Sequence, residues 1–155
     1  MPNDNAHAPR IRFATEADAE RIREIYAPYI DTPVTFEEEV PAPEEFLERV
    51  RAIRSRYPYL VAEDAGGVIG YAYAHELRER IAFQWNAELS VYLAPHAQGH
   101  GVGSILYGVL IELLRLQGIK AVYGVVTSPN PASERLHEAF GFSLMGVQPH
   151  AGYTC

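Results

Sequence analysis

The sequence predicts one α/β domain, in which helices cover a central sheet. Three observations support this fold class. The chain has 155 residues, of which 48% are apolar, enough for a single hydrophobic core. Segments with strand and helix patterns follow one another in the order βααββ-β-α-β-α-β. A glycine-rich turn joins one central strand to a strongly apolar helix.

The beginning of the chain is predicted as a tail, a strand and two helices. Residues 1–9 are expected to form a flexible N-terminal tail, so the domain itself would span residues 10–155. Residues 11–13 alternate as a short strand does, and Thr15 with Asp18 has the pattern of a capping box at a helix start. Apolar residues at helical spacing then define two helix faces: Ile22, Ile25, Tyr26 and Tyr29, followed by Phe46, Leu47, Val50 and Ile53.

Three strands are predicted in the middle of the chain. Residues 59–63 and 68–75 are apolar, aromatic or β-branched, and the turn-forming residues 64–67 between them indicate a hairpin. Residues 87–93 alternate apolar and more polar side chains, as a strand with one buried face does. Pro95 ends this third strand.

The last part of the chain is predicted to alternate helices and strands. Residues 104–117 are apolar nearly all round, so this helix must be largely buried, and Gly118 is placed as its C-terminal cap. Residues 121–126 form a buried strand, and Asn130 with the proline after it begins a short helix that Gly141 ends. Residues 142–147 form one more strand.

Composition and charge exclude several classes of function. A net charge of −7 argues against a general binder of nucleic acid or anionic membranes, which are held by clustered Lys and Arg. Lys120 is the only lysine and Cys155 the only cysteine, so neither Schiff-base chemistry nor an internal disulfide has suitable residues. No apolar run reaches the length of a membrane span, and we expect a cytoplasmic protein.

The glycine-rich turn at residues 98–103 is a candidate anion site. It reads Gln-Gly-His-Gly-Val-Gly and lies before a helix, where free N–H groups and the helix dipole attract negative charge. A tight turn without a ligand explains the glycines about equally well. The sequence lacks the Gly-Lys-Ser/Thr ending of a P-loop and the spacing of a dinucleotide-binding turn.

Gln-x-x-Gly-x-Gly between a strand and a helix resembles the pyrophosphate-binding signature of the GNAT superfamily of N-acetyltransferases. Residues 130–133 and 136–142 resemble the second cofactor segment of that superfamily. Residues 25–30, 32–36, 88–93 and 151–153 are similar to the phosphinothricin and methionine sulfoximine acetyltransferase subfamily. The resemblance implies a GNAT fold, with a mixed central sheet and helices on both faces. Members of the subfamily continue with a final strand that this sequence lacks, and many are homodimers.

The resemblance also implies acetyl transfer from acetyl-CoA to the amine of a small amino-acid-like substrate, by direct attack in a ternary complex. The backbone of Val91, Tyr92 and Leu93 would pair with the pantetheine arm. The turn would hold the pyrophosphate, with Asn130 and Ser133 contributing from the other side of the cofactor. The residues implied in the turn are Gln98, Gly99, His100, Gly101, Val102, Gly103 and Ser104.

Two residues at family positions are candidates for the acid–base chemistry. Glu88 would be the general base that deprotonates the substrate ammonium, and His137 stands where many members of the superfamily have a tyrosine acid. Which of the two removes the proton stays open. Glu88 could also be the solvent-facing half of the strand alternation, and His137 a packing residue.

The resemblance suggests a substrate pocket with Arg80 as an anion anchor, walled by Phe36, Phe83 and Tyr26, although Tyr26 could equally be core. The histidines share no ligand spacing, and we expect no metal site. Two other readings remain. The acceptor could be a protein N-terminus, a polyamine or an antibiotic amine, or the chain could be a CoA-binding sensor without turnover.

Overall fold

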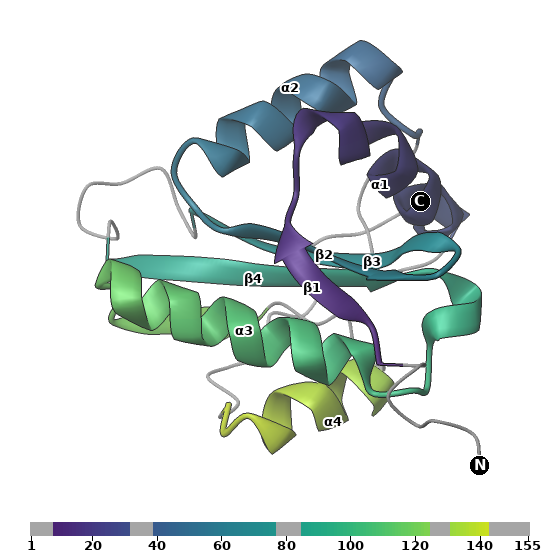
Figure 1. The fold of residues 1–155 in the computed structure, drawn as a ribbon. Helices are drawn as coiled ribbons and strands as arrows, with labels where there is room; N and C mark the ends of the chain where they lie inside the picture. Colours follow the sequence, from purple (N-terminus) through teal and green to yellow (C-terminus); the bar gives the residue numbers. More distant parts are fainter. Residues whose placement is uncertain (1–7, 32–38, 77–84, 125–130, 143–155) are drawn as a thin grey trace.

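The computed structural model describes residues 8–31, 39–76, 85–124 and 131–142, and their strands form one mixed five-stranded sheet in the order β1-β2-β3-β4-β5 (Figure 1). The first four strands are antiparallel neighbours and β5 is parallel to β4. Their bounds are β1 (Arg10–Phe13), β2 (Tyr59–Asp64), β3 (Gly67–Glu76), β4 (Asn86–Leu93) and β5 (Ala121–Gly124).

The helices lie on both faces of this sheet, which confirms the predicted fold class. In Figure 1, α1 and α2 lie above the sheet, and α3 and α4 lie below it. Short 3-10 helices accompany them in the described ranges. The bounds are η2 (Glu16–Asp18), α1 (Ala19–Tyr26), η3 (Ala27–Asp31), α2 (Pro43–Arg54), η5 (Pro95–Ala97), α3 (Val102–Gln117) and α4 (Pro131–Ala139).

Helix α3 is buried along the line of side chains that faces the sheet. Leu106, Leu110 and Leu114 follow one another at a spacing of four residues, and each is 0% exposed. The helix begins after Gly101, whose φ is 79°, and ends at Gly118, whose φ is 96°. Both glycines adopt the left-handed conformation that other residues rarely take. The helix starts two residues earlier than the sequence pattern predicts, because Val102 and Gly103 are already buried against the sheet.

The two faces of the sheet carry different kinds of side chain. Toward α3 the sheet presents small and aliphatic residues, namely Leu60, Ala62, Ala72, Ala74, Ala87 and Leu89. Toward α1 and α2 it presents mainly tyrosines, namely Tyr59, Tyr71, Tyr73 and Tyr92. We call these the aliphatic face and the tyrosine face.

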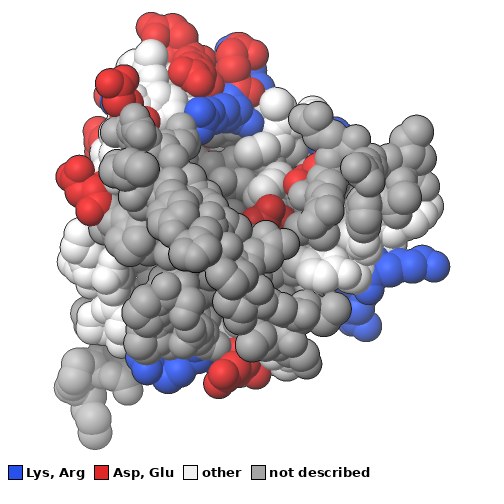
Figure 2. Space-filling model, turned by 180° about the vertical axis from the view of Figure 1, so that it is seen from behind, with Lys and Arg blue, Asp and Glu red and all other residues white. Residues whose placement is uncertain are grey.

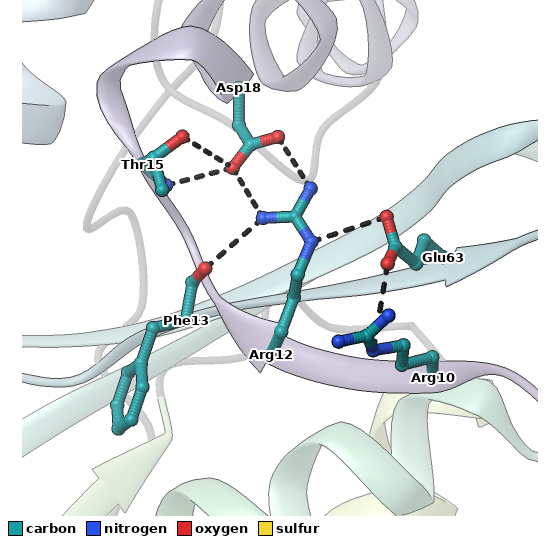
Figure 3. Close-up of polar contacts among 6 residues, drawn as sticks. All are labelled: Arg10, Arg12, Phe13, Thr15, Asp18 and Glu63. Atoms are coloured by element: carbon teal, nitrogen blue, oxygen red, sulfur yellow. Dashed lines mark hydrogen bonds and ion pairs between the residues drawn. The ribbon is translucent and has the colours of Figure 1, made fainter.

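Polar contacts around Arg12 attach β1 to η2 and β2 (Figure 3). The Arg12 guanidinium donates to both carboxylate oxygens of Asp18 at 2.8 Å, and its Nε lies 3.2 Å from the carboxylate of Glu63. The Thr15 N–H also donates to Asp18, at 2.8 Å, as in the predicted capping box. These hydrogen bonds, that from Arg12 above all, hold the pKa of Asp18 below its usual value. They fix where the chain passes from β1 into α1.

Several predicted segments fall outside the described residues. They are most of the N-terminal tail, the end of the strand at 125–126, nearly all of the strand at 142–147, and residues 151–153. In the described part of the chain, no helix is both long enough and apolar enough to cross a membrane.

Candidate active site

Among the described residues, the pairing between β4 and β5 covers the first half of β4. It runs from Asn86 opposite Ala121 to Leu89 opposite Gly124, and among the described residues no strand pairs with this edge of β4 beyond Leu89. The Ala94 N–H donates to the Ile69 carbonyl on the β3 side, at 2.8 Å. Because successive residues of a strand point their N–H and C=O groups to opposite edges, those of Leu93 point to the β5 side.

The hydroxyl group of Tyr29 lies at this edge of β4. It donates to the Leu93 carbonyl oxygen at 2.9 Å and accepts from the Leu93 N–H at 3.3 Å. The side-chain amide of Gln98 donates to the same hydroxyl at 3.2 Å. The end of β4 is thereby connected to the start of the glycine-rich turn. The sequence pattern places Tyr29 only on a helix face, and this contact was not predicted.

The glycine-rich turn has the backbone geometry that an anion site needs. Gly99 and Gly101 both have a φ of 79°, and Gly101 caps α3 without any side-chain hydrogen bond. The first N–H groups of a helix have no partner within it, so those of the first turn of α3 point out of its N-terminal end. A pyrophosphate fits this arrangement of N–H groups and helix dipole. Gln98, Gly99, His100, Gly101 and Ser104 are exposed, whereas Val102 and Gly103 are buried.

Glu88 lies on the tyrosine face and is not a solvent-facing strand residue. Its neighbours Ala87 and Leu89 point into the aliphatic face. Its side chain is only 20% exposed, and its carboxylate oxygen is 3.4 Å from Nε2 of His75, its partner in the β3–β4 register. Burial raises the pKa of Glu88, and the nearby imidazole acts in the opposite direction. The carboxyl group therefore has the partly desolvated surroundings typical of a general base.

His137 is buried and both of its ring nitrogens have partners. Nδ1 lies 2.7 Å from the Ser133 carbonyl oxygen, which can only accept a hydrogen bond, so Nδ1 carries the proton. Nε2 then accepts from the Tyr107 hydroxyl, at 2.9 Å. Burial, together with the negative charge of Glu88, raises the pKa of Tyr107. These contacts select a single tautomer for the neutral form of the ring, which is held between α3 and α4.

The ring of His137 occupies the space beside Gly124, the last residue of β5. A Cβ atom on Gly124 would overlap the ring. Gly124 is paired with Leu89, the neighbour of Glu88, so both acid–base candidates lie near the point where the described pairing of β4 and β5 ends. Their side chains approach this point from opposite faces of the sheet, Glu88 on the tyrosine face and His137 from the side of α3 and α4.

Of the remaining predicted site residues, some are buried or half-buried and others lie outside the described residues. Tyr26 is buried in the core on the tyrosine face, with its ring edge-on to Tyr92 at 5.4 Å. Tyr92 itself, Val91 and Leu93 are half-buried on β4, and Ser133 is half-buried on α4 beside His137. A contact between Tyr26 and substrate stays a prediction. The predicted site residues that lie outside the described residues are Phe36, Arg80, Phe83 and Asn130.

Basic side chains on the face seen in Figure 2 stand in separate small groups, and acidic ones gather over α2 at the top of the molecule. Several of these charges pair along α2, as Arg49 does with Glu45 and Arg51 with Glu48. Within the described ranges, no group of three or more His, Cys, Asp or Glu residues is placed to hold a metal ion.

The family model for the acetyltransferase (GNAT) domain matches residues 11–154. The chain belongs to the GNAT acetyltransferase family. This match covers nearly the whole chain, and it confirms the resemblance drawn from the glycine-rich turn.

Two relatives within the GNAT family are named as acetyltransferases of small amino-acid analogues. The chain is 41% identical to a phosphinothricin N-acetyltransferase of Streptomyces viridochromogenes over 92% of this chain and 79% of that protein. It is 35% identical to an L-methionine sulfoximine/L-methionine sulfone acetyltransferase of Salmonella typhimurium, over 92% of this chain and 84% of the relative.

A solved GNAT structure has the same fold. The phosphinothricin acetyltransferase of Sinorhizobium meliloti, crystallised in complex with acetyl-CoA, superposes with a TM-score of 0.90 at 37% sequence identity. The match covers 94% of this chain and 80% of that one. The described elements are therefore arranged as in a GNAT enzyme that binds acetyl-CoA.

Proposed function

We propose that this chain transfers the acetyl group of acetyl-CoA to the amine of a small amino-acid-like substrate of the phosphinothricin, methionine sulfoximine or methionine sulfone type. One observation carries the proposal. Beyond Leu89, where its described pairing with β5 ends, β4 leads to the glycine-rich turn at the start of α3. The names of the two relatives support the class of acceptor, and the complex of the similar solved structure supports the donor.

The residues available for acetyl-CoA follow from this arrangement. Backbone groups of Val91 and Leu93 would hydrogen-bond the pantetheine arm along the β4 edge, with Tyr92 between them, and Leu93 would exchange its contacts with the Tyr29 hydroxyl for those with the cofactor. The turn from Gln98 to Ser104 would hold the pyrophosphate through N–H groups, so the acidic net charge of −7 is no obstacle. Asn130 and Ser133 would hold the other side of the cofactor. The thioester supplies an activated acetyl group.

Glu88 is the proposed general base. An amino acid carries an ammonium group near neutral pH, and it must lose a proton before it attacks the thioester directly in a ternary complex. A carboxylate whose pKa is raised by burial accepts this proton more readily than an exposed one. Activity should fall as the pH drops through the pKa of Glu88, because the protonated carboxyl group cannot act as a base.

His137 is proposed as part of a proton relay. Its Nδ1 proton is directed at the Ser133 carbonyl, and its Nε2 accepts from Tyr107, so the Tyr107 hydroxyl is the group through which it can exchange a proton. In such a relay, the Tyr107 oxygen would take up a proton released in the site while its own proton passes to His137 Nε2.

The acceptor pocket belongs to the same proposal. Arg80 would grip the acidic head of the substrate through paired hydrogen bonds, and Phe36, Phe83 and Tyr26 would form its walls. A homodimer and a cytoplasmic location remain predictions.

The proposal is tested by measuring release of the CoA thiol from acetyl-CoA in the presence of a panel of amino acids and their sulfoximine, sulfone and phosphinate analogues. We expect turnover with at least one analogue. Glu88→Gln should lower kcat by about 100-fold or more, whereas Glu112→Gln, which removes an exposed carboxylate on α3 paired with Arg115, should leave it unchanged. Absence of thiol release with every acceptor would refute the proposal, and full activity of Glu88→Gln would refute the assigned base.

A further inference from the structure

His75 faces the carboxylate of Glu88 across two neighbouring strands. The residues are direct partners in the β3–β4 register, and Nε2 of His75 is 3.4 Å from Oε2 of Glu88. Neither side chain is fully exposed, since His75 is 33% and Glu88 20% accessible. Their proximity therefore results from the pairing of β3 with β4 and does not depend on a chance surface contact.

The proton positions on His75 follow from its second contact. Its Nδ1 lies 3.2 Å from the backbone carbonyl oxygen of Glu76, which can only accept, so Nδ1 carries a proton. Nε2 then meets the Glu88 oxygen. Two unprotonated atoms with lone pairs would repel each other there. A proton between them, either on Nε2 as an imidazolium or on the carboxyl group, removes this repulsion.

The groups around this pair supply little competing charge. From the described part of the chain, Tyr73 packs against the imidazole with ring centroids 5.7 Å apart, and Tyr123 is opposite Glu88 on β5. The charge of Glu88 also acts on Tyr107 of α3, which lies on the aliphatic side of the sheet. Tyrosines are neutral near pH 7. The carboxylate of Glu76 is itself ion-paired with Arg56.

We propose that His75 is a positioning residue for the general base: it shares one proton with Glu88, which keeps the carboxylate ionised and leaves its other oxygen for the acceptor amine. The kinetic part of this inference rests on the proposed function, whereas the shared proton does not. Burial raises the pKa of Glu88, and the charge of His75 lowers it. Removing the imidazole should therefore raise this pKa.

The test compares the wild-type protein with His75→Gln. Glu88 is titrated by NMR of the ¹³C-labelled glutamate carboxyl groups, with Glu88→Gln to assign the signal. We expect the pKa of Glu88 to rise by about one unit in His75→Gln. The acidic limb of the kcat/KM profile should move upward by the same amount. His96→Gln, which removes an exposed histidine from η5, should leave the Glu88 titration unchanged.

Two further variants separate positioning from a purely structural role. His75→Phe keeps a ring against Tyr73 but carries no proton, and it provides the same titration if His75→Gln does not fold. In a Glu88→Gln background, His75→Gln should have no additional effect on kcat, because its partner is already absent.

The outcomes are distinct. An unchanged Glu88 titration in both His75 variants, or an equal loss of kcat with and without Glu88, would overturn the role of His75. A shifted titration in a protein that releases no CoA thiol would refute the proposed function while the proton-sharing pair stands.

Discussion

The two faces of the sheet differ in what their side chains can do besides pack. Toward α3, the sheet presents mainly alanines and leucines, which contribute only burial. Toward α1 and α2, the stacked rings of Tyr59, Tyr71, Tyr73 and Tyr92 form the core, and each carries a hydroxyl group. His75 and Glu88 continue the tyrosine face along the same two strands.

This difference indicates that the two faces of the sheet have different roles. The aliphatic face holds α3 in place, and with it the glycine-rich turn at its N-terminal end. The tyrosine face packs as a core near β2 and becomes polar toward the β3–β4 register pair of His75 and Glu88. A residue can change face only if strand register changes, because successive side chains alternate. Mutations on the two faces should therefore have different consequences.

The largest expected loss of stability comes from the aliphatic face. Leu110→Ala should lower the free energy of unfolding by about 3 to 4 kcal/mol, because Leu110 is 0% exposed and its removal leaves a cavity between α3 and the sheet. Urea denaturation followed by circular dichroism measures the change. Leu116→Ala on the same helix is the control, since Leu116 is 76% exposed, and it should cost less than about 0.5 kcal/mol. Equal effects of the two variants would contradict the assigned face of α3.

The end of β5 should be the next most sensitive place. Gly124→Ala introduces a Cβ atom into the space of the His137 ring, which both Ser133 and Tyr107 hold. We expect a loss of about 2 to 3 kcal/mol in unfolding free energy, from overpacking and a broken buried hydrogen bond.

Gly108→Ala is the matched control for this glycine. It lies in α3, where a Cβ atom would make an ordinary 3.8 Å contact with Phe140, and alanine favours the helix. Its unfolding free energy should rise by about 0.5 to 1 kcal/mol. If Gly124→Ala were as stable as Gly108→Ala, His137 would not be packed against β5.

The tyrosine face should make the protein sensitive to alkali, with the smallest effect of the three. Burial raises the pKa of Tyr71 and Tyr59 well above the ordinary value of 10.0. The folded state therefore keeps these protons that the unfolded chain loses, so stability is complete below about pH 10 and decreases above it. Each such tyrosine should cost about 1.4 kcal/mol at pH 11.

Tyr71→Phe checks this linkage. The variant should regain about 1.4 kcal/mol relative to wild type between pH 7 and pH 11, measured as the change in urea midpoint at each pH. An identical pH dependence in the two proteins would show that Tyr71 ionises as readily in the folded state as in the unfolded chain.

Much of the fold could be predicted because local patterns determine it. The apolar spacing of α3, the hairpin of β2 and β3, and the alternation along β4 each depend on neighbouring residues, and their observed bounds differ from the expected ones by few residues. The glycine-rich turn was also predictable, since it joins a strand to a helix and has a recognisable spacing.

The contacts of the candidate site could not be predicted in the same way. The pairing of His75 with Glu88 depends on the register of β3 against β4, which the intervening loop length does not fix. The contact of His137 with Gly124 joins two elements whose relative position depends on the whole fold. Tyr29 was missed because the first helix was expected to include it. Instead, α1 ends at Tyr26 and the proline-containing η3 carries Tyr29 to the end of β4.

The mixed topology of the sheet has a consequence for the order of assembly. β1 to β4 pair antiparallel, two of them through a short hairpin, whereas β5 can join only after the 16-residue α3 has formed the crossover. Contacts between distant parts of a chain form more slowly than local ones. The seam between β4 and β5 should therefore close after the hairpin of β2 and β3 as the protein folds, and its amides should exchange with solvent sooner than those between β2 and β3. Glu88 and the glycine that His137 packs against both lie along this later seam.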